Sequence, residues 1–451
     1  MPASKDILKT LKELIEQSPA DQTEALLMTE DSSLTRFTPG SVHQHVAEQN
    51  QTLVLRALVG KQAAAVTTNL LQPSSLRTTL GKAVSLAQAL PPNPDSLSLP
   101  FPRPIPKVKT FHENIRRLTP GKKVKTIQEA MAMARGKGAS ASGAFSHGVV
   151  EVAVLNSLGV ETYQKYSDLF FHLIAQKDRG SGYASFVSRD PDRMQIDSLT
   201  QAALSKISGG NVVEVPPGEY EVILEPDAVH EILAFMAYLG FHALAVQEDR
   251  SFFCGHFGEK LLDGKVTIYD DGLDPQGLQV PFDFEGVPKQ KVVFFDQGVA
   301  RNITHDSRTA GRERKESTGH ALIPPNTEGP IPVNLFMEGG DSSLGKMIRS
   351  VRRGIYVTRF HYTNVVEPMK AVITGMTRDG TFWVEDGEIK HPVKNLRFTE
   401  SILKAFSRVK AVSRERKICT SGSVYGRRFI TGTVAPAVQV EGFNFSGVSS
   451  L

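Results

Sequence analysis

Cysteine is nearly absent from this chain, whose 451 residues contain only Cys254 and Cys419. Two cysteines cannot build the disulfide framework of a small secreted protein. Long apolar runs are missing too, since no stretch approaches the roughly 20 residues of a membrane-spanning helix. The first 16 residues are amphipathic, with charges of both signs and without the apolar core of a signal peptide. We therefore expect a cytoplasmic protein with no membrane partner.

An excess of one charge is also missing. The sequence has 52 basic and 48 acidic residues, which gives a net charge of +4. Nucleic-acid binding usually leaves a concentrated basic surface, so we expect no nucleic-acid partner. Hydrophobic residues make up 40% of the chain and charged residues 22%, a balance typical of globular proteins. At roughly 150 residues per domain, the length predicts two or three domains.

The first 210 residues show the same helix-then-strands pattern twice. Apolar residues at helical spacing mark the helices, and alternation marks the strands. Helices are expected at 4–17, 73–90, 119–134 and 196–208, and strands at 24–30, 34–37, 42–48, 52–59, 62–67, 139–145, 149–156, 162–175 and 182–189. The proline-rich segment 91–106 favours an extended linker. The pattern predicts an α+β fold whose N-terminal domain, 1–210, combines helices with an antiparallel sheet and suggests a duplication.

Residues 211–451 predict a β-rich C-terminal domain with few helices. One main helix is expected at 228–246, followed by short strands separated by Gly and Asp. Hairpin turns are expected at Asp379-Gly380 and Asp386-Gly387. Further helices are expected at 341–351, with Asp341 or Ser342 as the N-cap and Gly354 as the stop, and at 396–412.

His230 and Glu231 stand side by side on the main predicted helix. Zinc peptidases use such a pair, because the histidine binds the metal and the glutamate is the general base for metal-bound water. A second histidine belongs four or five residues further on, where this chain has Ala234 and Phe235. Neither side chain can bind a metal, so the motif is incomplete. The alternative is that His230 and Glu231 are ordinary polar positions near a helix start.

Two other segments could contact a peptide. Gly339 and Gly340 would allow an extended chain to approach the backbone closely, although the segment also reads as a simple helix start. His361 and Tyr362 belong to an alternating segment and could line a cleft. The alternative for this second segment is an ordinary strand with one solvated face.

The order and spacing of several segments resemble the TldD/PmbA family of bacterial and archaeal proteins. These segments include E-P-D-A-V-H-E (225–231), S-F-F-C-G-H-F-G-E-K (251–260), S-T-G-H-A (317–321), M-E-G-G-D-S-S-L (337–344) and G-I-Y-V-T-R-F-H-Y-T-N (354–364). The resemblance covers nearly the whole chain. The resemblance implies a family with two branches. Proteins of the TldD branch are zinc peptidases with an H-E-x-x-x-H motif and a distant cysteine ligand. In the other branch, PmbA or TldE, this set is missing and the protein pairs with a TldD-type subunit.

Phe235 in the place of the second histidine matches the PmbA branch. The resemblance therefore implies a degenerate subunit without a cofactor of its own, in a cytoplasmic complex that acts on unfolded, extended peptides. Zinc would come with a TldD-type partner subunit, and a homodimer is the alternative assembly. Two alternatives stay open. The chain could be an autonomous metallopeptidase, with His230 and Cys419 as metal ligands and Glu231 as the catalytic base. It could also be a regulatory binding protein that modulates DNA gyrase or a toxin–antitoxin pair, since the family carries the label of DNA gyrase modulator.

Overall fold

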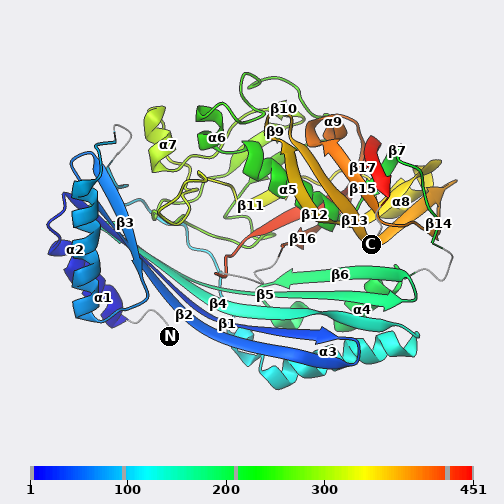
Figure 1. Cartoon of the computed structure of the whole chain (residues 1–451), viewed down its shortest axis with the longest axis horizontal. Coiled ribbons are helices and arrows are strands. Elements are labelled where there is room, and N and C mark those ends of the chain that lie inside the picture. The colour runs from blue at the N-terminus through cyan, green and yellow to red at the C-terminus, as the bar shows by residue number, and fades with distance from the viewer. Residues whose placement is uncertain (1–4, 94–97, 208–211, 422–426, 449–451) are drawn as a thin grey trace.

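The computed structural model describes residues 5–93, 98–207, 212–421 and 427–448. Its N-terminal part is built on one antiparallel sheet with the strand order β3-β2-β1-β4-β5-β6 (Figure 1). The strands are β1 (Gln22–Thr38), β2 (Ser41–Val59), β3 (Gln62–Thr68), β4 (Ser140–Asn156), β5 (Glu161–Lys177) and β6 (Gly180–Ser188). Since β1 pairs with β4 at the centre, two successive three-stranded units form a continuous sheet. The repeated pattern in the sequence therefore corresponds to a repeated architecture.

Two pairs of helices cover opposite ends of this sheet (Figure 1). They are α1 (Lys5–Glu16) with α2 (Pro73–Ala89), and α3 (Pro120–Gly136) with α4 (Ile196–Leu204). The first pair packs on a core that includes Leu27 and Leu55, and the second on a core that includes Phe145 and Phe171. Because side chains alternate along a strand, the other sheet face is free to pack against the C-terminal half. There Val152 and Tyr166 share a core with Phe282.

The C-terminal half contains a second, larger sheet, in which β17 pairs with both β15 and β7. Strands β7, β12, β13, β15 and β17 thus form a closed ring of pairings. The strands of this half are β7 (Gly218–Leu224), β8 (Ile268–Asp270), β9 (Val292–Asp296), β10 (Val299–Ala300), β11 (Asn334–Met337), β12 (Arg353–Glu367), β13 (Val372–Glu385), β14 (Glu388–Pro392), β15 (Leu396–Ser401), β16 (Val409–Cys419) and β17 (Gly432–Val448). The fold is α+β, as the sequence predicts.

Helix α5 (Pro226–Gly240) is the element that positions the candidate site. Proline at its first position is compatible with a helix start, where the missing N–H has no helical partner. One side of α5 carries Val229, Ile232, Leu233 and Met236, which are buried in the main C-terminal core. The opposite side is therefore left for polar residues. The remaining helices of this half are short: α6 (Ala243–Gln247), α7 (Ser307–Arg312), α8 (Leu344–Ser350) and α9 (Ile402–Phe406).

Several predicted elements differ from those in the structure. The helix predicted at 396–412 is wrong, because this segment forms β15, the single turn α9 and β16. Residues of β15 alternate between buried and more exposed positions and pair with β13 and β17. This long-range pairing outweighs local helix propensity. The helix predicted at 228–246 is interrupted after Gly240, and the chain resumes as α6 beyond His242.

The turn predicted at Asp379-Gly380 is also wrong, since both residues lie inside β13. The register with β12 shifts here, and both residues have positive φ angles, 53° and 120°. These features define a β-bulge, for which Asp-Gly is as suitable as for a turn. Asp386-Gly387 does form the predicted turn, between β13 and β14. Two expectations around α8 also fail, since Ser343 is the N-cap and Gly354 begins the pairing of β12 with β7.

The proline-rich segment is partly described. Residues 98–106 form no regular element, yet Leu99 is buried and the Pro100 carbonyl accepts a hydrogen bond from Asn156. The segment is therefore fastened to the ends of the central strands β1 and β4 of the N-terminal sheet. The predicted domain boundary at 210/211 lies outside the described residues and stays a prediction. Within the part of the chain that the structure describes, no helix is long and apolar enough to cross a membrane.

Candidate functional site

His230 lies on the less buried side of α5, with both imidazole nitrogens engaged. Nδ1 lies 2.8 Å from the Thr433 hydroxyl and Nε2 lies 3.2 Å from the Ser421 hydroxyl. Burial lowers the pKa of His230 to about 4, with Asp227 opposing and Lys417 reinforcing this shift. The imidazole is therefore neutral at physiological pH, and its two nitrogens tie α5 to Ser421, just after β16, and to Thr433 on β17.

Cys419, the second predicted ligand, belongs to the same cluster. It ends β16 and pairs in register with Thr433, the residue whose hydroxyl contacts His230. The structure thus brings together two residues that are 189 positions apart in the sequence. Cys419 is fully buried, and burial together with the Asp227 carboxylate raises the pKa of its thiol well above the usual value. A nucleophile and a metal ligand both require the thiolate, so Cys419 must lose its proton before it can take either role.

Glu231 faces a different group of residues from His230. Burial raises the pKa of Glu231, while the Thr363 hydroxyl and Arg359 act against this shift. Arg359 is itself paired with Asp379, with Nε 2.9 Å from Oδ2, and stacks over the Tyr183 ring at 4.6 Å. Glu231 therefore lies near a charged contact between β12, β13 and the N-terminal sheet.

A cluster of three residues next to His230 was not found by sequence reasoning. Lys417 Nζ donates to Asp227 Oδ2 at 2.6 Å and to Ser185 Oγ at 2.7 Å. The Ser185 hydroxyl donates to Asp227 Oδ1 at 2.8 Å. We call Asp227, Lys417 and Ser185 the Lys417 contact. The available signals in the sequence were short-range spacings: Asp227 is three residues before His230, and Lys417 is two before Cys419.

The residues present do not fit the zinc ion that the H-E-x-x-x-H pattern implies. Both nitrogens of His230 already bond to hydroxyls, and the Lys417 ammonium lies in the cluster, paired with Asp227. Phe235 packs against the main C-terminal core. Among the residues described, no three His, Cys, Asp or Glu side chains are grouped in a way that could hold a metal ion. Catalytic zinc normally has three protein ligands.

The four predicted peptide contacts lie on other elements. Gly339 and Gly340 approach the backbone of residues 412–414 so closely that a Cβ on Gly340 would lie 2.6 Å from the Val412 carbonyl oxygen. This close packing explains structurally why both positions are glycine. His361 and Tyr362 lie on β12, and Tyr362 is 75% exposed and has a positive φ of 54°. A peptide contact at any of the four stays a prediction.

An apolar cavity of about 380 Å³ reaches the surroundings of His230. One wall comes from the N-terminal sheet and includes Met28 and Val152; the opposite wall includes Phe282 and Ile430. Ser421, the partner of His230 Nε2, also lines it. Cavities of this size and character are typical ligand sites. The side chains of Lys289 and His320 add polar groups to the lining.

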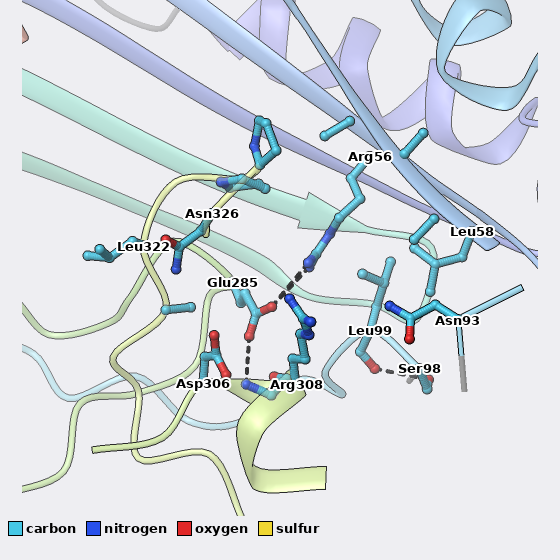
Figure 2. A pocket seen from close by; sticks show the side chains of 17 residues that line it. Arg56, Leu58, Asn93, Ser98, Leu99, Glu285, Asp306, Arg308, Leu322 and Asn326 are labelled. Atoms are coloured by element: carbon cyan, nitrogen blue, oxygen red, sulfur yellow. Dashed lines mark hydrogen bonds and ion pairs between the residues drawn. The ribbon is translucent and has the colours of Figure 1, made fainter. Parts of the chain in front are cut away.

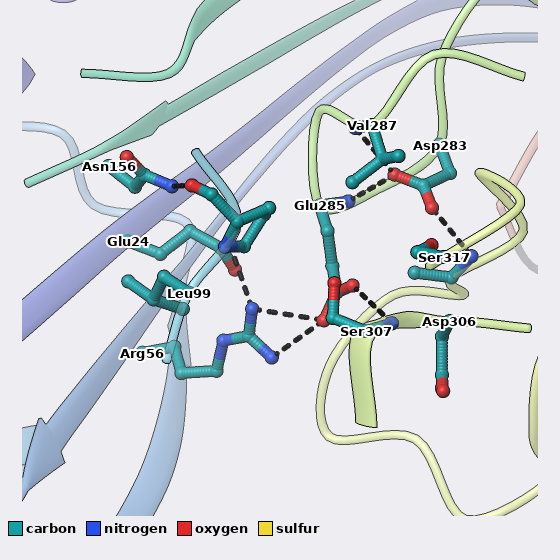
Figure 3. A network of polar contacts seen from close by, with 12 residues as sticks. Glu24, Arg56, Leu99, Asn156, Asp283, Glu285, Val287, Asp306, Ser307 and Ser317 are labelled. Carbon is teal, nitrogen blue, oxygen red and sulfur yellow. Dashed lines mark hydrogen bonds and ion pairs between the residues drawn. The ribbon is translucent and has the colours of Figure 1, made fainter. Parts of the chain in front are cut away.

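A second charged contact joins the two halves near another cavity, of about 250 Å³ (Figure 2). Figure 3 shows the Arg56 guanidinium between two carboxylates, Glu24 on β1 and Glu285 from the C-terminal half. The distances are 2.9 Å from Nη2 to Glu24 and 3.1 Å from Nη1 to Glu285. We call these three residues the Arg56 contact. Glu285 also accepts a hydrogen bond from the Ser307 backbone N–H, which fixes the start of α7.

Comparison with known proteins identifies the class to which this fold and site belong. The sequence profile of the PmbA/TldA metallopeptidase C-terminal domain matches residues 217–447, about half of the chain. The chain belongs to the TldD/PmbA family. It is 31% identical over 185 residues to "Uncharacterized protein MJ0231" of Methanocaldococcus jannaschii, covering 40% of this chain and 43% of that protein. A "Metalloprotease" of Methanothermobacter thermautotrophicus is 26% identical over 211 residues, covering 45% and 44%.

The solved structures extend the likeness in fold over nearly the whole chain. The crystal structure of TldE from Thermococcus kodakarensis superposes with a TM-score of 0.87 at 20% identity, covering 97% of this chain and 100% of that one. By sequence, in contrast, the chain spans less than half the length of the curated relatives named above. The family and the fold are therefore shown, and the names of relatives support a TldD-type peptidase family.

Proposed function

We propose that this chain is a PmbA/TldE-like subunit that contributes no metal of its own to a cytoplasmic TldD-type zinc peptidase. The observation that carries the proposal is the state of His230, whose two nitrogens are both bonded to hydroxyls while Phe235 holds the second histidine position. In this account a TldD-type partner supplies zinc and the general base. The present chain completes the enclosure around the substrate.

The proposed substrate is an unfolded, extended peptide. Such a chain exposes apolar side chains, and the 380 Å³ cavity beside Ser421 offers an apolar wall for them. Extended peptides also bind by adding a strand to the edge of a sheet, where backbone hydrogen bonds give affinity with little sequence preference. Both features favour recognition of unfolded chains over folded ones.

The test combines association with activity. The chain is purified alone and together with a TldD-type protein of the same organism, and the assembly is measured by light scattering after size exclusion. We expect a hetero-oligomer that hydrolyses unfolded peptides and loses this activity with a chelator. The isolated chain should be inactive. Failure of the two proteins to associate, or chelator-sensitive hydrolysis by the chain alone, would contradict the proposal.

The convergence of His230 and Cys419 favours one second candidate, an autonomous metallopeptidase with Glu231 as its base. E231Q separates the two candidates, because Gln has nearly the same shape but cannot accept the proton. If the partner supplies the base, complexes that contain E231Q keep their activity. If the chain is itself the enzyme, E231Q lowers kcat by the 100-fold or more that is typical of a lost general base, roughly 10²–10⁴.

A further inference from the structure

The side chains around the incomplete site converge from two elements. Asp227 and His230 are three residues apart on α5, so they lie on one face of the helix. Lys417 and Cys419 are two residues apart on β16, so they point to the same side of the strand. The Lys417–Asp227 ion pair joins the two faces, and the Asp227 carboxylate acts on both His230 and Cys419.

Ser185 connects this cluster to the N-terminal sheet. Its hydroxyl accepts from the Lys417 ammonium and donates to the Asp227 carboxylate. The ammonium therefore has two fixed partners from different halves of the molecule. The Lys417 side chain is one-third exposed and that of Asp227 is 11% exposed, so the pair is only partly shielded from solvent. Lys417 is notable for its position next to Asp227 and Ser185, and not for the depth of its burial.

We infer that Lys417 is a specificity-determining residue whose ammonium holds the positive charge at the position where metal-binding relatives would hold a divalent cation. It does so in two ways. It engages the Asp227 carboxylate, which acts on both His230 and Cys419, and it repels any second cation placed within about 4 Å. Phe235 alone therefore does not account for the missing metal site, and restoring a histidine at 235 does not restore zinc binding.

This inference rests on the proposed function, in which the chain works without a metal of its own, but it has an independent test. Zinc content is measured after equilibrium dialysis for wild type, F235H, K417M and the double variant F235H/K417M. We expect substoichiometric zinc in the wild type and both single variants and about one zinc per chain in the double variant. The double variant should exceed F235H in zinc affinity by roughly tenfold to 100-fold, the range over which residues around a metal alter its affinity.

Lys206 provides a matched control. Its Nζ lies 2.8 Å from Glu225 Oε2, also at the start of α5 and with similar partner chemistry. F235H/K206M should remain as poor in zinc as F235H, because Lys206 pairs with Glu225 instead of Asp227. F235H/K417R should also bind as little zinc as F235H, because arginine keeps the positive charge. K417R also guards against misfolding, since it preserves the ion pair.

Every outcome of this experiment either supports or overturns the inference. One zinc per chain in F235H with Lys417 intact would overturn the inference, as would zinc-free F235H/K417M that retains the wild-type circular dichroism spectrum. If F235H/K417M does not fold, a zinc-bound F235H/K417R overturns the inference and a zinc-free one supports it. Stoichiometric zinc in the wild type is a separate result, which contradicts the proposed function itself.

Discussion

Two of the charged contacts that join the halves of the molecule differ in their balance of charges. The Lys417 contact pairs one carboxylate with one ammonium and one hydroxyl. The Arg56 contact places two carboxylates on one guanidinium and is more deeply buried, with 1% and 8% exposure for Glu24 and Glu285. The carboxylates of the two contacts therefore lie in different electrostatic environments.

The pKa directions reflect this difference. For Asp227, burial acts to raise the pKa, but the ion pair with Lys417 and the Ser185 hydrogen bond outweigh burial, so the pKa is lowered. For Glu24, burial raises the pKa to about 7; Arg56 opposes the shift and Glu285 adds to it. A single cation neutralises one partly buried carboxylate well but two deeply buried carboxylates incompletely. We infer that the Lys417 contact belongs to the candidate site, whereas the Arg56 contact serves to hold the halves together.

The largest expected effect is that of R56M. Removing the guanidinium leaves Glu24 and Glu285 as buried carboxylates without a cation, a change that typically costs about 3–5 kcal/mol. Urea denaturation at pH 8 measures the loss. The control is R353M, whose arginine pairs with Glu385 on the surface at 70% exposure; such pairs contribute about 0–1 kcal/mol. Equal effects of R56M and R353M would show that the Arg56 contact is not a buried one.

The second expected effect concerns the pH dependence of stability in E24Q. Between pH 4.5 and about 7, Glu24 is ionised in the unfolded chain but keeps its proton in the folded one. Folding therefore binds a proton, and stability falls as pH rises through this window, by at most about 1.4 kcal/mol per pH unit. E24Q keeps a side chain that bonds to Arg56 but cannot titrate.

The free energy of unfolding of E24Q relative to wild type should thus increase from pH 4.5 to 7. Thermal or urea unfolding at several pH values provides the measurement. Parallel pH profiles for the two proteins would mean that Glu24 ionises normally and that Arg56 neutralises both carboxylates. That result would remove the difference between the two charged contacts.

The smallest expected effect is that of T433V, which changes a residue that contacts His230, next to the Lys417 contact. Valine preserves the shape but deletes the hydroxyl that lies 2.8 Å from His230 Nδ1. Loss of one such hydrogen bond costs about 1 kcal/mol. The matched control is T374V, which deletes a hydroxyl bonded to the Phe398 carbonyl away from α5. Both variants should be destabilised similarly, whereas an effect on the peptidase activity of the complex is expected for T433V alone.

Much of the N-terminal half could be predicted from the sequence. The ends of α2 and α3 follow from prolines at their starts and apolar periodicity, and β3, β5 and β6 lie within two residues of their predicted positions. The long strands β1, β2 and β4 were each expected as pieces, since polar residues such as Asp31 and Ser32 interrupt their pattern. Pairing on both sides within the sheet holds these residues in an extended conformation regardless of their propensity.

The candidate site could be predicted only in part. His230, Glu231 and Phe235 stand close together in the sequence, so the incomplete motif is visible there. The sequence does not show that Cys419 lies near His230, and no motif in it points to Ser185, Asp227 or Lys417. Ser185 lies 232 residues from Lys417, and no local pattern relates two such positions. The contact exists because β6, α5 and β16 come together in the folded chain.

The sequence by itself determined the α+β class, the repeated unit of the N-terminal half and the phenylalanine in the second histidine position, because periodicity and motif spacing are local properties of a chain. Only the tertiary structure decided that β17 closes a ring of strands with β7 and that the Lys417–Asp227 ion pair acts on His230 and Cys419. Such contacts depend on packing and pairing between distant segments, whose energies are set when the segments meet and not by the residues of either one alone.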